Sequence, residues 1–486
     1  MGTRRIGIIG AGVGGIAAAV RLREAGYDDV VILEKSSEVG GTWNHNRYPG
    51  LQCDVQSHLY SFSFEPFWDW SRPYGNGPEI RAYMNHVVDA YGLRPLVRFD
   101  TPVRAAAWDD VRSVWTVTTD TLDDAAFEFD VLVASPGMFN ELNWPDLEGR
   151  DDFAGVSFHS ARWDWDVDLA GKRVGVIGSA ASAVQFVPEV AKVAAHLTLF
   201  QRAANWVLPK DDTPYTDEER EYWRTHPDEV LERRRAIFEQ ADPNLTFSNP
   251  AALALHEKNI TAALAQVEDP DVRARLRPTV PYGCQRPIFS NHYFPTFNRE
   301  NVELVTDPID AVTTAGVRTA DGREHVCDVL VYATGFATTK YLSVIDVTGR
   351  DGLRLADSWR DGAHAFKGVT TAGFPNLFML YGPNTNNGSI IYMLEAQVDY
   401  TVAHVRWMDE AGLAWVDVRP EVEAAYNAEI DELIAGVGPW REGTCHNYYR
   451  GPAGRIVTQW PGPMSEYRRR TEEPDADAYE TAPQER

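Results

Sequence analysis

Two glycine-rich segments have the residue types and spacing of a turn that binds a dinucleotide. The first, residues 10–15, has the sequence GAGVGG and lies between an apolar strand over 5–9 and an apolar helix over 16–25. In the pattern G-x-G-x-x-G, the first glycine allows a tight turn, the second lets the backbone approach a pyrophosphate, and the third lets helix and strand pack closely. The free N–H groups at the start of the helix then bind the anion. These three roles fall on Gly10, Gly12 and Gly15.

The residue that ends the next strand indicates which ribose the turn accepts. Glu34 follows a strand over 30–33 and stands 24 positions after Gly10. A carboxylate at this place accepts hydrogen bonds from a ribose 2′-hydroxyl and repels a 2′-phosphate. The first unit therefore predicts an unphosphorylated ribose, as in FAD.

The second glycine-rich segment repeats this plan with the opposite charge at its end. Its elements are a strand over 173–177, a turn over 178–183, a helix over 184–193 and a strand over 197–200. Arg202 stands 24 positions after Gly178, and an arginine there accommodates a 2′-phosphate, which predicts NADPH. Ala180 and Ala183 replace the second and third glycines, so a purely structural repeat remains the alternative.

Bulk properties exclude several classes of partner. A chain of 486 residues is long enough for two or three domains. Its net charge of −25 would repel phosphate backbones and anionic lipid surfaces, so we expect neither nucleic acid nor membrane partners. The four cysteines form no C-x-x-C pair and have no histidine spacing suited to a metal, so we expect no metal site and a reducing, cytoplasmic location. The apolar run after Arg5 is too rich in glycine for a signal peptide, and no later run reaches the roughly 20 apolar residues of a membrane span.

Strand signals on both sides of the second unit predict that it interrupts the first domain. Strands over 115–119 and 127–134 are expected to return to the first sheet, and a similar strand opens the segment 328–335. Residues 211–280 are rich in Asp, Glu and Arg with helical spacing, which predicts a helical insert serving as a lid or access subdomain. The predicted fold class is therefore α/β, with two Rossmann-like dinucleotide-binding domains, the second inserted into the first, and a helical insert.

Domain boundaries follow from these signals. We expect the FAD-binding domain over 1–145 and 328–486, the NADPH-binding domain over 146–210 and 281–327, and the insert over 211–280. Within the insert, helices are predicted over 217–225, 227–240 and 251–267. The acidic, proline-containing tail 472–486 is predicted to be disordered.

The segment between the two units, residues 153–164, mixes aromatic, glycine and aspartate residues that suit no single regular element. An ordinary inter-domain linker explains this composition, and so does a junction that two cofactor sites share. Five residues stand in it at fixed spacing: Phe153, Gly155, His159, Trp163 and Asp164.

This spacing resembles the fingerprint F-x-G-x-x-x-H-x-x-x-W-(P/D) of the class B flavoprotein monooxygenases. The ending Trp163-Asp164 is similar to the Baeyer–Villiger monooxygenase branch, because the related N- and S-oxidising enzymes usually end the pattern with Tyr or Phe. Other segments resemble the family along nearly the whole chain: GGTW at 40–43, RYPG at 47–50, ATGF at 333–336 and GPNTN at 382–386.

The resemblance implies a reaction and its catalytic residues. In this family NADPH reduces FAD, the reduced flavin captures O₂ as a C4a-peroxyflavin, and the peroxide attacks a ketone to give an ester or lactone. By motif position, Arg286 is the cation that stabilises the developing charge, and Asp54 is the acid that orients it. A structural ion pair between domains is the alternative for these two residues. The motifs and the resemblance together give the expected cofactor-binding residues: Gly10, Gly12, Gly15, Glu34, Gly41, Thr42, Trp43, Asp54, Tyr60, Gly178, Ser179, Ser182, Gln185 and Arg202.

Two further residues qualify this assignment. His159 is expected to couple the domains rather than to act as a base, because small and aromatic residues surround it. Gln285 stands where the family often has Lys, so the strength of the preference for NADPH over NADH stays open.

Other functions also stay open. Oxygenation of an amine or sulfide shares every cofactor feature, and a nucleotide-binding sensor needs only the two turns. A disulfide-type flavoprotein reductase also has two dinucleotide domains, but it needs a closely spaced redox cysteine pair that this sequence lacks. The expected partners are a small ketone and O₂, whereas the sequence predicts neither which ketone nor the oligomeric state. Pocket-lining side chains are expected from the insert, from the region after Gly382 and from 445–460.

Overall fold

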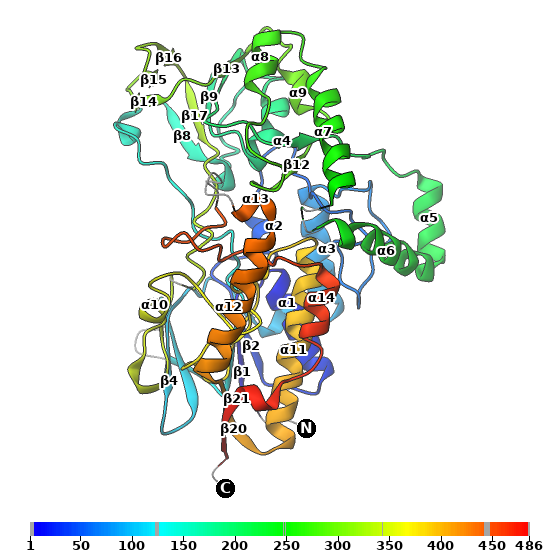
Figure 1. The fold of residues 1–486 in the computed structure, drawn as a ribbon, viewed down its shortest axis with the longest axis vertical. Helices are drawn as coiled ribbons and strands as arrows, with labels where there is room; N and C mark the ends of the chain where they lie inside the picture. Colours follow the sequence, from blue (N-terminus) through cyan, green and yellow to red (C-terminus); the bar gives the residue numbers. More distant parts are fainter. Residues whose placement is uncertain are drawn as a thin grey trace.

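The first glycine-rich segment lies in a five-stranded sheet whose strands are all parallel (Figure 1). The computed structural model describes residues 4–121, 126–245, 247, 249–342, 344–441 and 448–484. In sheet order the strands are β19 (Leu377–Met379), β7 (Val131–Ala134), β1 (Ile6–Ile9), β2 (Val30–Leu33) and β3 (Val97–Arg98). Strands from both sides of the second unit therefore share one sheet, which confirms that the first domain is discontinuous.

Different layers cover the two faces of this sheet. On one face α1 (Val13–Glu24) packs against α11 (Ile390–Glu410), and Leu394 of α11 lies over Gly14. On the other face the apolar side chains of Ile9 and Leu33 pack with Trp108 and Trp115 of a separate four-stranded sheet. That sheet consists of β18 (Asp346–Thr348), β4 (Val103–Asp109), β5 (Val114–Thr119) and β6 (Ala126–Phe129).

The separate sheet corrects one sequence expectation. The strand predicted over 115–119 exists, but as β5 it pairs antiparallel with β4 and β6 and does not return to the first sheet. The segment 127–134 forms two strands, of which only β7 joins β1. Apolar alternation indicates a strand but does not select its partner, because both sheets present apolar faces to the same core.

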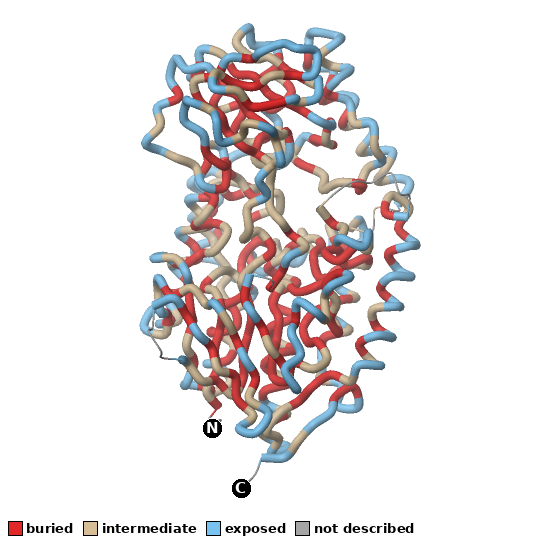
Figure 2. The backbone as a smooth tube through the Cα atoms, turned by 90° about the vertical axis from the view of Figure 1, so that its left-hand side faces the viewer, coloured by how far each residue is buried: buried red, intermediate tan, exposed pale blue. Residues whose placement is uncertain are grey.

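The second glycine-rich segment lies in a second five-stranded parallel sheet, at the upper end of the molecule in Figure 1. Its order is β13 (Val302–Val305), β10 (His196–Phe200), β9 (Arg173–Ile177), β17 (Val329–Tyr332) and β8 (Val156–His159). The predicted boundary at 328 is wrong by one strand, because β17 pairs with β9 and β8. Buried residues, red in Figure 2, run through both sheets.

The helical insert forms, with a fourth helix after the three that the sequence predicts. Its helices are α5 (Asp217–Thr225), α6 (Pro227–Ala241), α7 (Pro250–Leu264) and α8 (Pro270–Arg275), with α5 and α6 at the side of the molecule in Figure 1. Arg234 of α6 donates to Glu395 of α11 at 2.9 Å, and both side chains are nearly buried. This pair anchors the first half of the insert to the first domain.

The acidic tail is a further correction. Within residues 472–484, β21 (Tyr479–Pro483) pairs antiparallel with β20 (Leu413–Val418), and Tyr479 is buried. The prediction of disorder is therefore wrong for these residues, while 485–486 and the pocket-lining candidates 445–447 lie outside the described residues. None of the helices in the described part of the chain combines the length and apolar character needed to cross a bilayer.

Candidate cofactor-binding and active site

The two glycine-rich turns use the same backbone device. Gly10 has φ +97°, and a Cβ on it would lie 2.5 Å from the carbonyl oxygen of Ser135 at the end of β7. Gly178 has φ +104°, and a Cβ on it would lie 2.5 Å from the carbonyl oxygen of Ala333 at the end of β17. Both positions therefore require glycine for conformation and for space, as the pattern predicts.

The second glycine position differs between the turns in side chain but not in backbone. Gly12 is the N-cap of α1 with φ −82° and ψ −168°, and Ala180 is the N-cap of α4 (Ala181–Val190) with φ −87° and ψ −160°. A Cβ on Gly41, which has φ +54°, would lie 2.9 Å from Cα of Gly12. Gly12 and Gly41 thus form a strip of bare backbone beside the first turn. The methyl group of Ala180 is tolerated in the second.

A cavity of about 1240 Å³ joins the two turns. Residues from both domains and from the region after Gly382 line it. The sequence-predicted residues that line it are Gly10, Gly12, Glu34, Gly41, Thr42, Trp43, Asp54, Tyr60, Ser182, Gln185, Arg202 and Arg286. The structure places Gly15, Gly178 and Ser179 behind this surface. Gly15 packs helix against turn, and the Ser179 hydroxyl donates to the carbonyl of Ala203 at 3.3 Å.

The charged residues at the two strand ends occupy different environments. Glu34 is buried, and its carboxylate oxygens accept from the backbone N–H groups of Ala11 at 2.7 Å and Ser36 at 2.8 Å. Arg202 is exposed on the cavity rim, and no ion pair holds it among the described residues. Glu34 is therefore held rigidly, whereas Arg202 is available for an anion.

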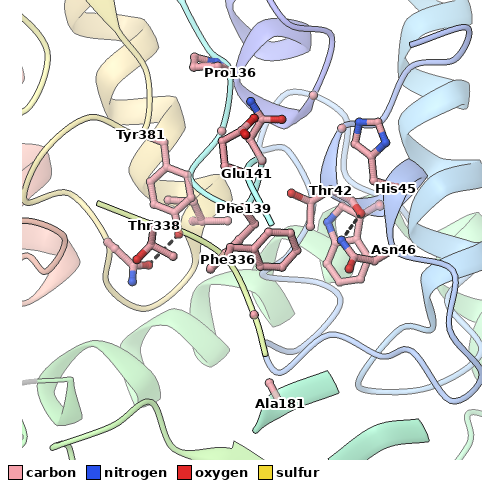
Figure 3. Close-up of a pocket in the computed structure, with 18 of the residues that line it drawn as sticks. Thr42, His45, Asn46, Pro136, Phe139, Glu141, Ala181, Phe336, Thr338 and Tyr381 are labelled. Carbon is pink, nitrogen blue, oxygen red and sulfur yellow. Dashed lines mark hydrogen bonds between the residues drawn. The ribbon is translucent and has the colours of Figure 1, made fainter. Parts of the chain in front are cut away.

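The loop that resembles the flavin-proximal segment places three predicted residues on the cavity wall. Thr42 and Trp43 belong to α2 (Thr42–His45), and Figure 3 shows Thr42 and Asn46 together on one side of the cavity. The Trp43 indole N–H donates to the Tyr60 hydroxyl at 3.0 Å. Burial raises the pKa of Tyr60 well above its ordinary value, so this hydroxyl stays protonated.

Asp54 and Arg286 meet across the domain interface, inside the cavity. Nε and one Nη of Arg286 each lie 2.7 Å from Oδ2 of Asp54, and about a third of each side chain faces open space. The Asp54 carboxylate raises the pKa of Arg286 against the opposing effect of burial. Burial alone would raise the pKa of Asp54, but the Arg286 charge and hydrogen bonds hold it below its ordinary value. Both groups are therefore ionised, and the arginine is a fixed cation.

Gln185 of α4, which is predicted to bind a cofactor, also forms hydrogen bonds between the two domains. Its Oε1 accepts from the Tyr48 hydroxyl at 3.0 Å and from the Gln52 N–H at 3.3 Å, and its Nε2 donates to the Gln52 carbonyl at 2.9 Å. The Gln52 side chain in turn accepts from Lys210 at 2.8 Å and donates to Asp212 at 3.1 Å. This network joins the first domain to the second and gave no signal in the sequence.

The five fingerprint residues lie outside the cavity lining, in β8 and the turns beside it. A Cβ on Gly155 would lie 2.5 Å from the Asp328 carbonyl oxygen, and the Phe153 ring packs beside it. Trp163 packs edge-on or tilted against Phe158 and Phe186, which ties the segment to α4. Asp164 caps the turn by accepting from the Asp166 N–H at 3.0 Å.

His159 is buried at the end of β8. Its Nδ1 accepts from the Ala161 N–H at 3.1 Å, and its ring packs near Trp144 and Phe336. Burial lowers its pKa to about 4, so the ring is neutral at physiological pH. Because Phe336 lines the cavity while His159 does not, this geometry supports coupling rather than proton transfer.

Several residues that line the cavity were not predicted from the sequence. Phe336 and Tyr381 point into the cavity in Figure 3, together with Phe139 and Thr338. Phe336 belongs to the segment ATGF and Tyr381 directly precedes GPNTN. The motifs therefore indicated this part of the chain, but not that these two side chains line the cavity. The cysteines also differ from expectation. Cys53 and Cys327 are free and buried, but Cys284 is disulfide-bonded, which the scatter of cysteines along the chain did not predict.

Comparisons with known proteins agree with this geometry. The pattern of the pyridine nucleotide-disulphide oxidoreductase family matches residues 7–221. A Baeyer–Villiger monooxygenase of Streptomyces coelicolor is 39% identical over 98% of this chain and 92% of its own length. A phenazine N-monooxygenase of Lysobacter antibioticus is 33% identical over 88% of this chain and 87% of its own length. The crystal structure of OTEMO in complex with FAD and NADP is similar with a TM-score of 0.87, at 30% identity and over 99% of both chains.

Proposed function

The chain belongs to the Baeyer–Villiger monooxygenase family, and we propose that it uses FAD and NADPH to insert one oxygen atom of O₂ beside a ketone carbonyl. The product is an ester or a lactone. The observation that carries this proposal is the Asp54–Arg286 pair, which lies in the cavity that both glycine-rich turns share.

The first turn fits FAD. The bare backbone of Gly12 and Gly41 leaves room for a pyrophosphate, and the buried Glu34 carboxylate lies on the cavity wall where a ribose hydroxyl would reach it. Thr42, Trp43 and Tyr60 would hold the rest of the cofactor along the same wall. When bound, the flavin supplies oxygen activation, which no side chain can supply.

The second turn fits NADPH. The N-terminus of α4 carries Ser182 on the cavity wall, and Arg202 offers a cation to a 2′-phosphate. NADPH supplies the hydride that reduces the flavin. The Gln185 network joins the two domains, and we expect it and the neutral His159 to set how the domains approach each other.

Arg286 performs the electrostatic part of the reaction. Negative charge develops on a ketone oxygen as its carbonyl carbon is attacked, and a preorganised guanidinium in a cavity stabilises that charge. Asp54 keeps the guanidinium in place, and it uses only Nε and one Nη in doing so. We expect the ketone oxygen to meet the remaining face of the guanidinium, beside the Tyr448 hydroxyl, so that one arginine binds its partner and the substrate at once.

The proposal is tested by following oxygen into product. Purified protein should be yellow and should consume O₂ when given NADPH. With ¹⁸O₂ and a panel of cyclic, linear, aryl and steroid-like ketones, the ester should carry one ¹⁸O atom. NADPH-driven O₂ consumption without labelled ester from any ketone would contradict the proposal.

Heteroatom oxygenation is the second candidate, because the similar Lysobacter antibioticus protein is named a phenazine N-monooxygenase. The ending Trp163-Asp164 of the fingerprint favours the ketone reaction. Competition between a ketone and a sulfide in one reaction vessel separates the two. A sulfoxide that forms at least tenfold faster than the ester would favour the heteroatom reaction.

A further inference from the structure

A second contact between the two domains lies beside the Asp54–Arg286 pair. Gln52 stands two positions before Asp54, and its side-chain oxygen accepts from Nζ of Lys210 at 2.8 Å. Gln52 and Asp54 belong to the first domain, whereas Lys210 and Arg286 belong to the second. One short segment of the first domain therefore meets two cations of the second.

The two cations belong to neighbouring strands of the second domain. The strand β11 (Val207–Leu208) pairs parallel with β12 (Ile288–Phe289). Lys210 stands two positions after the end of β11, and Arg286 stands two positions before the start of β12. The Lys210 N–H donates to Oδ1 of Asn291 at 3.0 Å, and Nδ2 of Asn291 donates to the Lys210 carbonyl at 2.8 Å. The two cations are therefore held at opposite ends of one hydrogen-bonded pair of strands.

The segment that receives both cations is fixed within the first domain. Cys53 lies between Gln52 and Asp54, and its N–H donates to the Gly75 carbonyl at 3.0 Å. Because the backbone between the two side chains is held in this way, a displacement of Gln52 is transmitted to Asp54.

Lys210 is a buried cation whose position its partners fix. Its side chain is only 4% exposed, and Nζ lies 3.8 Å from Asp212 and 4.6 Å from the centre of the Tyr74 ring. Burial lowers the pKa of Lys210, and the charge of Asp212 opposes this lowering. Among the described residues that line the cofactor cavity, Gln52 is included but Lys210 is not, so any effect of Lys210 on the reaction passes through Gln52.

We propose that Lys210 is a positioning residue for the reaction, and that its contact with Gln52 sets the angle at which the second domain presents Arg286 to Asp54 and to the substrate. A single contact fixes a distance between two domains, whereas two contacts at opposite ends of the β11–β12 pair also fix an orientation. The inference rests on the proposed function, because it concerns the guanidinium that stabilises the developing charge.

The kinetic test removes the second contact from either side. Lys210→Met removes the ammonium group but keeps most of the length of the side chain. We expect kcat for ester formation to fall about tenfold, because Arg286 is displaced, while the KM for the ketone and the rate of flavin reduction change less than twofold. Gln52→Ala removes the same contact from the first domain and should give the same loss. Lys258→Met, at an exposed lysine of α7, is the control and should change none of these values.

A double substitution separates positioning from a general loss of structure. FAD content and melting temperature establish that each variant is folded. In an Arg286→Lys background, Lys210→Met should lower kcat less than twofold, because the planar guanidinium that it positions is already absent. A further tenfold loss in that background would overturn the inference, since Lys210 would then act independently of Arg286.

A crystal structure of Lys210→Met gives a readout that does not depend on the reaction. We expect the Arg286 guanidinium to leave the two 2.7 Å contacts that it makes with Oδ2 of Asp54. Unchanged contacts would overturn the positioning role and leave the proposed function intact. If the unaltered protein forms ester from no ketone, the proposed function falls instead, and a displaced guanidinium would then describe only the joint between the domains.

Discussion

Arg286 approaches Asp54 through two nitrogens that share a single carboxylate oxygen, each at 2.7 Å. The two residues are 232 positions apart in the chain and come from different domains. A pair that only fastened two domains would gain more from a fork in which each nitrogen meets its own oxygen. Asp54 thus engages two of the three guanidinium nitrogens, and the pair ties the position of the cation to the relative placement of the domains.

Replacing Arg286 with Ala should therefore abolish ester formation without preventing flavin reduction. Loss of a preorganised donor to a developing oxyanion costs about 10²–10³-fold in kcat. Stopped-flow reduction by NADPH and product analysis measure the two steps separately. Arg286→Lys is the matched control, because it keeps a cation without the planar fork, and it should retain a small fraction of the activity. Unchanged ester yield in Arg286→Ala would exclude the proposed role.

The close approach of Gly12 and Gly41 predicts that a side chain at position 41 weakens FAD binding. In Gly41→Ala, the new methyl would lie 2.9 Å from Cα of Gly12, on the surface proposed to meet the pyrophosphate. FAD content after purification should fall at least tenfold. Gly26→Ala is the control: Gly26 also has positive φ, but a Cβ on it would have no atom within 4 Å, so the change should cost about 1 kcal/mol of stability and retain the flavin. Equal FAD content in the two variants would argue against the assignment.

Arg202 should determine the choice between NADPH and NADH. Because no ion pair holds it among the described residues, its charge is free for a 2′-phosphate. Arg202→Gln should raise the KM for NADPH about 10–100-fold and change the KM for NADH little. The exposed Arg299 offers a control substitution on the same domain. A parallel rise in both KM values would show that Arg202 does not contact the phosphate.

The βαβ units could be predicted from the sequence because local rules dictate them. The strands Val30–Leu33 and Arg173–Ile177 end at the residues predicted, since a glycine turn or a charged residue follows each directly. The positions of Glu34 and Arg202 on the cavity wall follow from the same spacing. Here sequence neighbours are also spatial neighbours.

The features that the sequence did not predict depend on contacts between distant segments of the chain. The sequence of Val329–Tyr332 predicts a buried strand but not the sheet that the strand joins. Only its pairing with β9 shows that it belongs to the second domain. The tail was predicted to be disordered because its composition is acidic, yet Tyr479 is buried and its hydroxyl lies 3.0 Å from that of Tyr400. The loop-fastening roles of Asn384 and Asn387 could not be predicted, because the partners of their amides lie in a segment some 70 residues away.

The pair of His364 and Glu423 predicts a pH dependence of stability. His364 Nδ1 lies 2.7 Å from Glu423 Oε1 and its Nε2 lies 3.2 Å from the Ser358 carbonyl, so both ring nitrogens face acceptors. Burial would lower the pKa of His364, but the hydrogen bond and charge of Glu423 together with the Ser358 carbonyl outweigh burial and raise the pKa above 6.5. The stabilisation is therefore full below pH 6.5 and is lost as the pH rises through the folded-state pKa.

Urea unfolding between pH 5.5 and 8.5 should show this loss. The free energy of unfolding of the unaltered protein should exceed that of His364→Gln by about 1 kcal/mol at the acidic end, and the difference should shrink toward the alkaline end. His292→Gln, at an exposed histidine, is the control variant. A difference that grows with pH would contradict the sign of the shift.

Gln185 has two possible roles, as a ligand of the nucleotide or as a contact between the two domains. The sequence predicts that Gln185 binds a cofactor. In the structure, its Oε1 accepts two hydrogen bonds and its Nε2 donates one, all to Tyr48 and Gln52 of the other domain. We therefore expect Gln185→Ala to slow flavin reduction several-fold with little change in the KM for NADPH, because the domains lose a shared contact while the nucleotide loses none. Stopped-flow reduction at several NADPH concentrations measures both, and Gln240→Ala, at an exposed position of α6, is the control. A raised KM with an unchanged limiting rate would return Gln185 to the role of a nucleotide ligand.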